Sequence, residues 1–163
     1  MVETDNVEFD NLTLLRQECL RQVCTGLHNS EFIVKKATEI FIQLRQEASI
    51  PNKIERMIYL LSKKFQLVSI TNGNCDANNL SIGQNFTKNY SPEHGYRAKP
   101  HAEMFETVFR DFNINPSELL HVGDERKSDE LGAINADCQF YLLAPFLNES
   151  KLDTAVDDFI SIL

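Results

Sequence analysis

The spacing of apolar residues along the chain changes near residue 50. Before that point, apolar side chains recur every three or four residues in two runs. This spacing predicts two helices, one with Asp10 or Asn11 as its N-cap and Gly26 as its end, and one with Ser30 as its N-cap. After it, short apolar runs alternate with helical segments of about ten to fifteen residues, as in a parallel sheet covered by helices. The pattern predicts an α/β protein with a helical unit over residues 1–50 and an α/β core over residues 51–163.

The predicted elements of the core follow one another without a low-complexity linker or an internal repeat. A helix starts at Pro51, a residue that suits a first helical turn, and runs to about Lys63. The later segments are, in chain order, a strand over 67–70, a weaker strand over 85–90, a helix over 100–112, a strand over 119–122, a helix over 128–136, a strand over 139–143, and a tail from 153 with a short helix and an extended Phe-Ile-Ser-Ile-Leu end.

The charge of the chain limits the classes of partner that it can bind. Sixteen basic residues stand against 24 acidic ones, for a net charge of −8 without a block of like charge. Nucleic acids and anionic membranes require a basic surface, so we expect neither as a partner. No apolar run approaches the roughly 20 residues that cross a bilayer, and the acidic start does not resemble a signal peptide.

The four cysteines carry no motif. Cys19, Cys24, Cys75 and Cys138 form no Cys-x-x-Cys pair, which excludes a zinc knuckle or redox motif of that type. Cys138 lies in an apolar run and is expected in the core. Free thiols are typical of reducing compartments, so we expect a cytoplasmic protein.

Residues that could bind a phosphate follow the first predicted strand and precede a predicted helix. The hydroxyl of Thr71 and the backbone amides of Asn72 and Gly73 could cradle an anion at the carboxyl end of a strand, although Asn-Gly is also an ordinary turn. Lys99 stands before Pro100 at a predicted helix start, where it could neutralise a phosphate attracted by the helix dipole. A solvated lysine side chain is the other interpretation.

Two carboxylates flank the turn after the strand over 119–122. Asp124 follows Gly123 at the strand end, and Asp129 opens the next predicted helix. Carboxylates placed in this way can converge on one hard cation such as Mg²⁺. The alternative is a helix start in which Asp129 and Glu130 oppose the dipole without a metal.

Taken in order, three segments resemble motifs of the haloacid-dehalogenase superfamily. LVSITNGN, RAKPHAEMF and LLHVGDERKSDELGAINAD are similar to its second, third and fourth motifs, over about residues 50–143. The resemblance implies a Rossmann-like parallel sheet with helices on both faces, preceded by part of a helical cap. It also implies Mg²⁺-dependent hydrolysis of a small phosphorylated metabolite, and the surroundings of Thr71 and Gly123 are nearest to a branch with flavin-pathway, sugar-phosphate-like substrates. Asp137 replaces the family's usual Gly at a helix end, which Asp tolerates.

The same resemblance implies a role for each candidate residue. Thr71 would hydrogen-bond the transferring phosphoryl group, helped by the amide of Asn72. Lys99 would pair with the charges of the nucleophile and the phosphate. Asp124 would be a ligand of Mg²⁺, and Asp129 would support that site directly or through water.

The first motif of the family, an apolar strand ending in Asp-x-Asp, has no counterpart before Thr71. Asp5 and Asp10 do not follow apolar runs, so the chain is expected to be N-terminally truncated and to begin inside the cap. One Asp of that motif is the nucleophile that forms an aspartyl-phosphate, and the other is the acid and base. The strand lies in the family between those that end at Thr71 and Gly123, so its absence would also leave the centre of the sheet open.

Three hypotheses follow. The first is a Mg²⁺-dependent phosphatase whose N-terminal piece is absent from this chain, which alone would be inactive because loss of a nucleophile removes most of the rate. The second is a non-catalytic relative that binds phosphate, Mg²⁺ or a protein partner. In the third, another chain supplies the strand in trans, or the Phe-Ile-Ser-Ile-Leu tail enters the open position.

Overall fold

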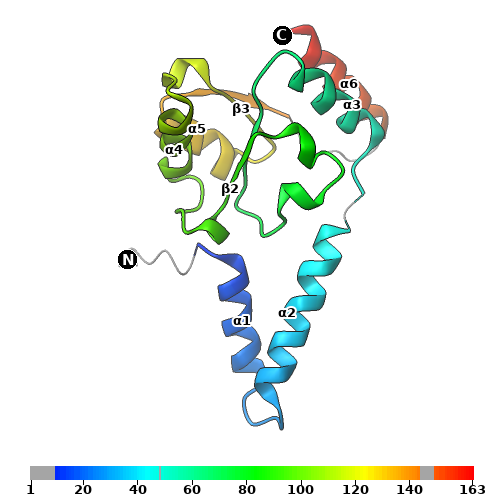
Figure 1. Ribbon diagram of the computed structural model, residues 1–163, viewed down its shortest axis with the longest axis vertical. Helices are drawn as coiled ribbons and strands as arrows, with labels where there is room; N and C mark the ends of the chain where they lie inside the picture. Colours follow the sequence, from blue (N-terminus) through cyan, green and yellow to red (C-terminus); the bar gives the residue numbers. More distant parts are fainter. Residues whose placement is uncertain (1–9, 48, 144–148) are drawn as a thin grey trace.

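The N-terminal part of the described chain is a two-helix hairpin that projects from an α/β body (Figure 1). The computed structural model describes residues 10–47, 49–143 and 149–163. Helix α1 spans Leu12–Val23 and begins as predicted after Asn11, whose side-chain oxygen accepts hydrogen bonds from the amides of Thr13 and Leu14, each 3.0 Å long. Helix α2 spans Ser30–Gln46, and its N-cap is Asn29 rather than the predicted Ser30.

The apolar stripes of the hairpin are mostly exposed. Val34 and Cys24 are buried, but α1 itself contains no buried residue. Exposed large apolar side chains of the hairpin and its connection include Leu14, Val23, Leu27, Phe32, Ile40 and Leu44. The three- to four-residue spacing therefore predicts the helices correctly. The two helices pack mainly on each other, which leaves much of each apolar stripe in solvent.

The body contains four short strands arranged as two separate parallel pairs. Strand β1 spans Val68–Ile70 and pairs with β2, Lys88–Tyr90. Strand β3 spans Leu120–Gly123 and pairs with β4, Gln139–Leu142. The prediction of an α/β fold with parallel strands is confirmed. Within the described ranges no strand lies between β1 and β3, so the sheet is divided into two halves.

Each half of the sheet has its own apolar core. Helices α3, Asn52–Ser62, and α6, Glu149–Ser161, cover β3 and β4 around Met57, Val156 and Phe159. Helix α4, Glu103–Phe112, covers β1 and β2 around Tyr90, Met104 and Val108. The predicted extended end of the chain is wrong, because α6 continues through this segment to Ser161 and its side chain Phe159 packs in a core instead.

The segment after β3 is more irregular than the predicted helix over 128–136. A single π-helical turn, Arg126–Glu130, precedes the short helix α5, Leu131–Asn135. Asp137 then has a φ of 55°, the left-handed conformation expected where the resembling family has Gly. Cys138 is only half-buried, contrary to the expected core position. No helix in the described part of the chain is both long and apolar enough to span a membrane.

Candidate active site

Thr71 and Asn72 lie directly after β1, at its carboxyl end. The amide of Thr71 donates to the carbonyl of Tyr90 (3.0 Å), and its hydroxyl oxygen accepts from the amide of Gly73 (2.9 Å). The side chain of Asn72 holds the backbone of Lys99 from both sides: its amide donates to the Lys99 carbonyl (2.8 Å), and its oxygen accepts from the Lys99 amide (2.7 Å). The turn after β1 therefore fixes the position of Lys99.

Lys99 is buried, and its ammonium group joins two parts of the site. Its Nζ donates to the carbonyl of Ile70 (2.7 Å) and to Asp129 Oδ1 (2.5 Å). Helix α4 begins at Glu103, later than the predicted start at Pro100. The position of Lys99 is thus fixed by its ion pair and hydrogen bonds, and Lys99 does not directly precede a helix as predicted.

Asp129 is the most heavily hydrogen-bonded group of the site. Besides Lys99, its Oδ1 contacts His121 Nε2 at 3.0 Å, and its Oδ2 accepts from the amides of Asp124 (3.1 Å) and Glu125 (3.0 Å). Gly123 makes this approach possible, since a Cβ there would lie 2.3 Å from Asp129 Cγ. A direct metal bond would have to replace one of these hydrogen bonds, so the carboxylate is arranged to hold the turn that carries Asp124.

The charge state of this cluster follows from its hydrogen bonds. Burial favours the neutral form of Asp129, but the hydrogen bonds from His121 and Lys99 and the lysine charge outweigh it and lower its pKa. Burial also lowers the pKa of His121, against the hydrogen bond to Asp129. A neutral His121 must carry its proton on Nε2 to donate to the carboxylate. The cluster thus contains one anion, one cation and one neutral donor.

Asp124 presents the carboxylate that is free to bind a cation. Its side chain is exposed and makes no hydrogen bond or ion pair with other described residues, while its backbone is held by Asp129. The described chain contains no cluster of three or more His, Cys, Asp or Glu side chains suited to a metal. Mg²⁺ commonly binds one or two carboxylates and completes its shell with water and phosphate oxygens, so Asp124 fits as one ligand of such an ion.

The structure connects four of the five residues predicted from the sequence through one hydrogen-bonded chain. Asn72 holds Lys99, Lys99 pairs with Asp129, and Asp129 holds the backbone of Asp124. Thr71 adjoins Asn72 at the end of β1. Sequence reasoning missed His121, although a histidine inside an otherwise apolar strand directly before Gly-Asp was a visible signal.

A polar cavity of about 300 Å³ lies beside Thr71, between the hairpin and the ends of β1 and β2. Its wall includes Thr13 of α1, whose hydroxyl accepts from the Asn74 side chain at 3.2 Å. Other polar residues in the wall include Ser69, Asp76, Asn89, Ser91, Glu93 and His94. The cavity is large enough for part of a small molecule, with which these polar side chains could form hydrogen bonds.

Comparison with known proteins matches this architecture. The family model described as haloacid dehalogenase-like hydrolase matches residues 4–137. The chain belongs to this family. Its resemblance to the second, third and fourth motifs is thereby confirmed as membership, and the hydrogen-bonded cluster around Asp129 lies within the matched region.

A curated relative extends the comparison. The chain is 33% identical over 107 residues to 5-amino-6-(5-phospho-D-ribitylamino)uracil phosphatase YigB of Escherichia coli K12, an alignment that covers 64% of this chain and 44% of the relative. The chain thus spans less than half the length of that curated relative.

Solved structures share the fold at lower identity. A 2-haloacid dehalogenase from Pseudomonas syringae superposes with a TM-score of 0.78 at 21% identity, over 97% of this chain and 76% of that one. A haloacid-dehalogenase-superfamily hydrolase from Geobacter sulfurreducens gives 0.57 at 21% identity, over 89% and 72% of the two chains. At this identity, the two structures support the fold alone.

Proposed function

We propose that the site binds the phosphoryl group of a small phosphorylated metabolite together with Mg²⁺. The observation that carries the proposal is the arrangement around Asp129, which pairs with the buried Lys99 and holds the backbone of Asp124, whose own carboxylate is exposed. Lys99 would balance negative charge on the phosphate. The hydroxyl of Thr71 and the backbone amide of Asn72 would donate hydrogen bonds to the phosphate oxygens. Bound through Asp124, Mg²⁺ would supply further neutralisation of phosphate charge.

The parent reaction that we infer is phosphomonoester hydrolysis through an aspartyl-phosphate. The matched relative is named as a phosphatase of a phosphorylated ribitylaminouracil, and the polar cavity beside Thr71 is compatible with a hydrophilic metabolite of that kind. Strands β1 and β3 contain no Asp or Glu that could act as the nucleophile. Asp124 follows β3, and its carboxylate would bind the cation instead. We therefore propose that this chain alone binds phosphate without turning substrate over.

A non-catalytic protein is the second candidate. It is favoured by the same lack of a nucleophile on the described strands. In that case phosphate or Mg²⁺ binding would be the function itself. We also propose a cytoplasmic location, which the free cysteines favour.

Hydrolysis of a generic aryl phosphate tests the inactivity of the chain. We expect no release of phenolate above the buffer rate with either Mg²⁺ or EDTA, and retention of inorganic phosphate by equilibrium dialysis when Mg²⁺ is present. Turnover that requires Mg²⁺ and disappears in Asp124→Asn would contradict the claim of inactivity. Absence of phosphate retention under every condition would contradict the proposed phosphate site in both candidate functions.

A further inference from the structure

The carboxyl end of α2 lies beside the body, while the connection between α1 and α2 lies far from it (Figure 1). At this end, the carbonyl of Arg45 accepts a hydrogen bond from Cys75 Sγ at 3.5 Å. Ile42, three residues before Arg45, lines the polar cavity together with Thr71. Because residues three apart share one face of a helix, Arg45 lies on the face of α2 that is turned toward the end of β1.

The guanidinium group of Arg45 extends to the turn over residues 71–73. A Cβ at Gly73 would lie 3.7 Å from Arg45 Nη2 and 3.2 Å from Thr71 Oγ1, so a cation and a hydroxyl group lie close to the same point. The φ of Gly73 is not positive, so the backbone does not require a glycine there. The absence of a side chain instead keeps the space between Thr71 and Arg45 open.

Both groups at this point can donate hydrogen bonds to an added ligand. The side chain of Arg45 is exposed and forms no hydrogen bond or ion pair within the described ranges. The Thr71 hydroxyl oxygen accepts from the Gly73 amide at 2.9 Å, and its proton is donated to no other described residue. A guanidinium group and a hydroxyl group are both donors, so an anion with several acceptor oxygens is complementary to them.

The charges of the proposed site leave one negative charge without a counterpart. Lys99 is paired with Asp129 at 2.5 Å, so its charge is largely compensated within the protein. A phosphomonoester carries a charge of about −1.5 to −2 at neutral pH, and the Asp124 carboxylate adds one more. One Mg²⁺ would leave these groups about one charge negative. The guanidinium group of Arg45 would supply the missing positive charge.

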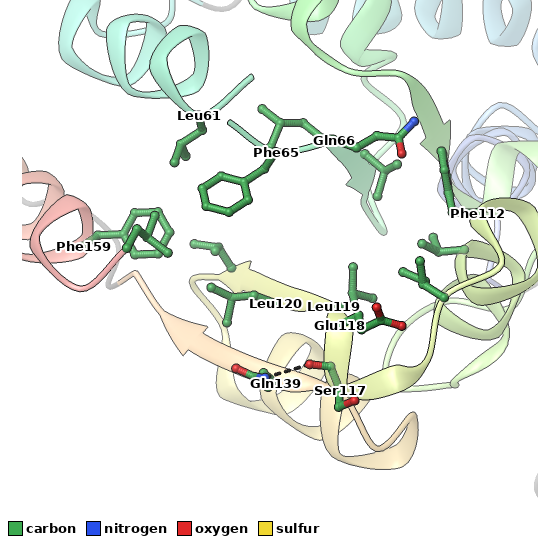
Figure 2. Close-up of a pocket in the computed structure, with 16 residues that line it drawn as sticks. Leu61, Phe65, Gln66, Phe112, Ser117, Glu118, Leu119, Leu120, Gln139 and Phe159 are labelled. Atoms are coloured by element: carbon green, nitrogen blue, oxygen red, sulfur yellow. Dashed lines mark hydrogen bonds between the residues drawn. The ribbon is translucent and has the colours of Figure 1, made fainter. Parts of the chain in front are cut away.

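The hollow between the two halves of the sheet offers no such charge. It has a volume of about 450 Å³, and its wall includes Leu61, Phe65, Leu120 and Phe159 (Figure 2). Among the described residues that line it, none is Lys, Arg or His, and the charged side chain present, Glu118, is acidic. A phosphate is therefore complementary to the region beside the hairpin and not to this hollow.

We propose that Arg45 binds the phosphate group of the ligand, as a second cation that the hairpin contributes. This inference rests on the proposed phosphate site around Thr71 and Asp124. A guanidinium group can donate two parallel N–H groups to two phosphate oxygens, while the Thr71 hydroxyl donates to the same group. The ligand would then contact the body and the hairpin at once, and its binding would hold the last turn of α2 beside β1.

Substitution separates this role from a purely helical one. Arg45 lies in the last turn of α2, where a positive charge also interacts favourably with the helix dipole. Arg45→Lys keeps that charge but loses the planar pair of donors, and Arg45→Met loses both. Arg56→Met is the matched control, because Arg56 on α3 is another exposed arginine without a hydrogen bond or ion pair to the other described residues.

Equilibrium dialysis of inorganic phosphate in the presence of Mg²⁺ measures the effect. We expect about tenfold weaker binding by Arg45→Met, the loss of a charge-assisted hydrogen bond at an exposed position. Arg45→Lys should bind about threefold more weakly than the parent chain, since an ammonium group cannot replace the guanidinium fork. Arg56→Met should bind as the parent chain does. Far-UV circular dichroism should show the same fold in every variant, because both side chains are exposed.

Chemical modification of the parent chain gives a second readout without a substitution. Phenylglyoxal reacts with accessible guanidinium groups, and mass spectrometry of peptides locates the modified arginines. We expect phosphate with Mg²⁺ to slow the modification of Arg45 several-fold and to leave the modification of Arg56 unchanged.

The possible failures of the inference can be told apart. Equal phosphate binding by Arg45→Met and the parent chain, or equal modification of Arg45 with and without phosphate, would overturn the inference and leave the proposed function intact. An equal loss of binding in Arg56→Met would assign the effect to net charge and would also overturn it. A parent chain that retains no phosphate would overturn the proposed phosphate site and this inference together.

Discussion

Lys99 Nζ lies 2.5 Å from Asp129 Oδ1, with both side chains buried, and this ion pair spans the two halves of the divided sheet. Lys99 is bonded to the last residue of β1, and Asp129 is bonded to the turn that follows β3. One interaction therefore holds the two strand ends at a fixed separation and also sets the position of the Asp124 carboxylate. We therefore expect stability and the proposed phosphate binding to depend on the same pair.

Removing the lysine should be costly. Lys99→Met leaves the buried Asp129 carboxylate without its cation, and the expected loss in the free energy of unfolding is about 3–5 kcal/mol. Urea denaturation followed by far-UV circular dichroism measures it. Lys53→Met is the matched control, because Lys53 pairs with Asp153 and Asp157 at the surface and its loss should change little. Equal losses in the two variants would contradict the role of the buried pair.

Replacing both partners separates stability from binding. A buried ion pair exchanged for apolar residues of similar size is often neutral or better for stability. We expect Lys99→Met with Asp129→Leu to recover most of the stability lost in Lys99→Met alone, while Mg²⁺-dependent phosphate binding stays absent. Urea denaturation and equilibrium dialysis on the same preparations check this. Recovery of phosphate binding in the double variant would exclude Lys99 and Asp129 from the site.

Acidification should destabilise the protein in two steps. The pKa of His121 is lowered in the folded state, so the unfolded chain binds more protons below its ordinary pKa of about 6.5, and stability falls as pH drops from 7 to 5. The pKa of Asp129 is also lowered in the folded state, so its contribution is present above its ordinary pKa of about 3.9 and is lost as pH falls below it.

The first step can be assigned with a variant. His121→Gln keeps a donor near Asp129 but does not titrate, so the melting temperature should become flatter between pH 7 and 5. His28→Gln, an exposed position on the hairpin connection, should retain the slope of the parent chain. A parent slope that survives in His121→Gln would show that another group causes it.

Gly123 should tolerate no side chain. In Gly123→Ala the new Cβ would lie 2.3 Å from Asp129 Cγ, so Asp129 must move and its bonds to the Asp124 and Glu125 amides must lengthen. We expect a loss of about 1–3 kcal/mol in the free energy of unfolding, typical of overpacking, together with weaker phosphate binding. Gly73→Ala is a milder comparison, since its Cβ would meet Thr71 Oγ1 at 3.2 Å. Unchanged binding in Gly123→Ala would contradict the role given to Asp129.

The local pattern of the chain predicts its elements well and its surfaces poorly. The caps and apolar periodicity place the start of α1 and both ends of α3 and β3 within a residue or two of their observed positions. The same periodicity does not show whether another element packs on the apolar face of a helix. In α2, the apolar side chains Phe32, Ile33, Ile40 and Leu44 are exposed. The end of the chain was mispredicted because Phe159 to Leu163 has an apolar run typical of a strand, while packing of Phe159 against Tyr141 favours the helix.

The candidate site was predicted through its motifs rather than its geometry. Thr71, Lys99, Asp124 and Asp129 are recognisable by type and order, and the family match includes them all. Which of these residues is exposed and which is held by hydrogen bonds depends on contacts between distant segments. Examples are the hydrogen bonds between Asn72 and the Lys99 backbone and between His121 and Asp129. Single-sequence patterns carry no information on such contacts.

Titration calorimetry of inorganic phosphate in the presence of Mg²⁺ tests the central claim most directly. We expect the chain to bind phosphate with Mg²⁺ and to lose that binding in Asp124→Asn, because the exposed carboxylate is the proposed cation ligand. The control Asp137→Asn removes another exposed carboxylate at a position with a φ of 55°, a backbone that Asn also accepts, and should bind normally. Phosphate binding that is equal in Asp124→Asn and Asp137→Asn, or that is independent of Mg²⁺, would contradict the proposed site.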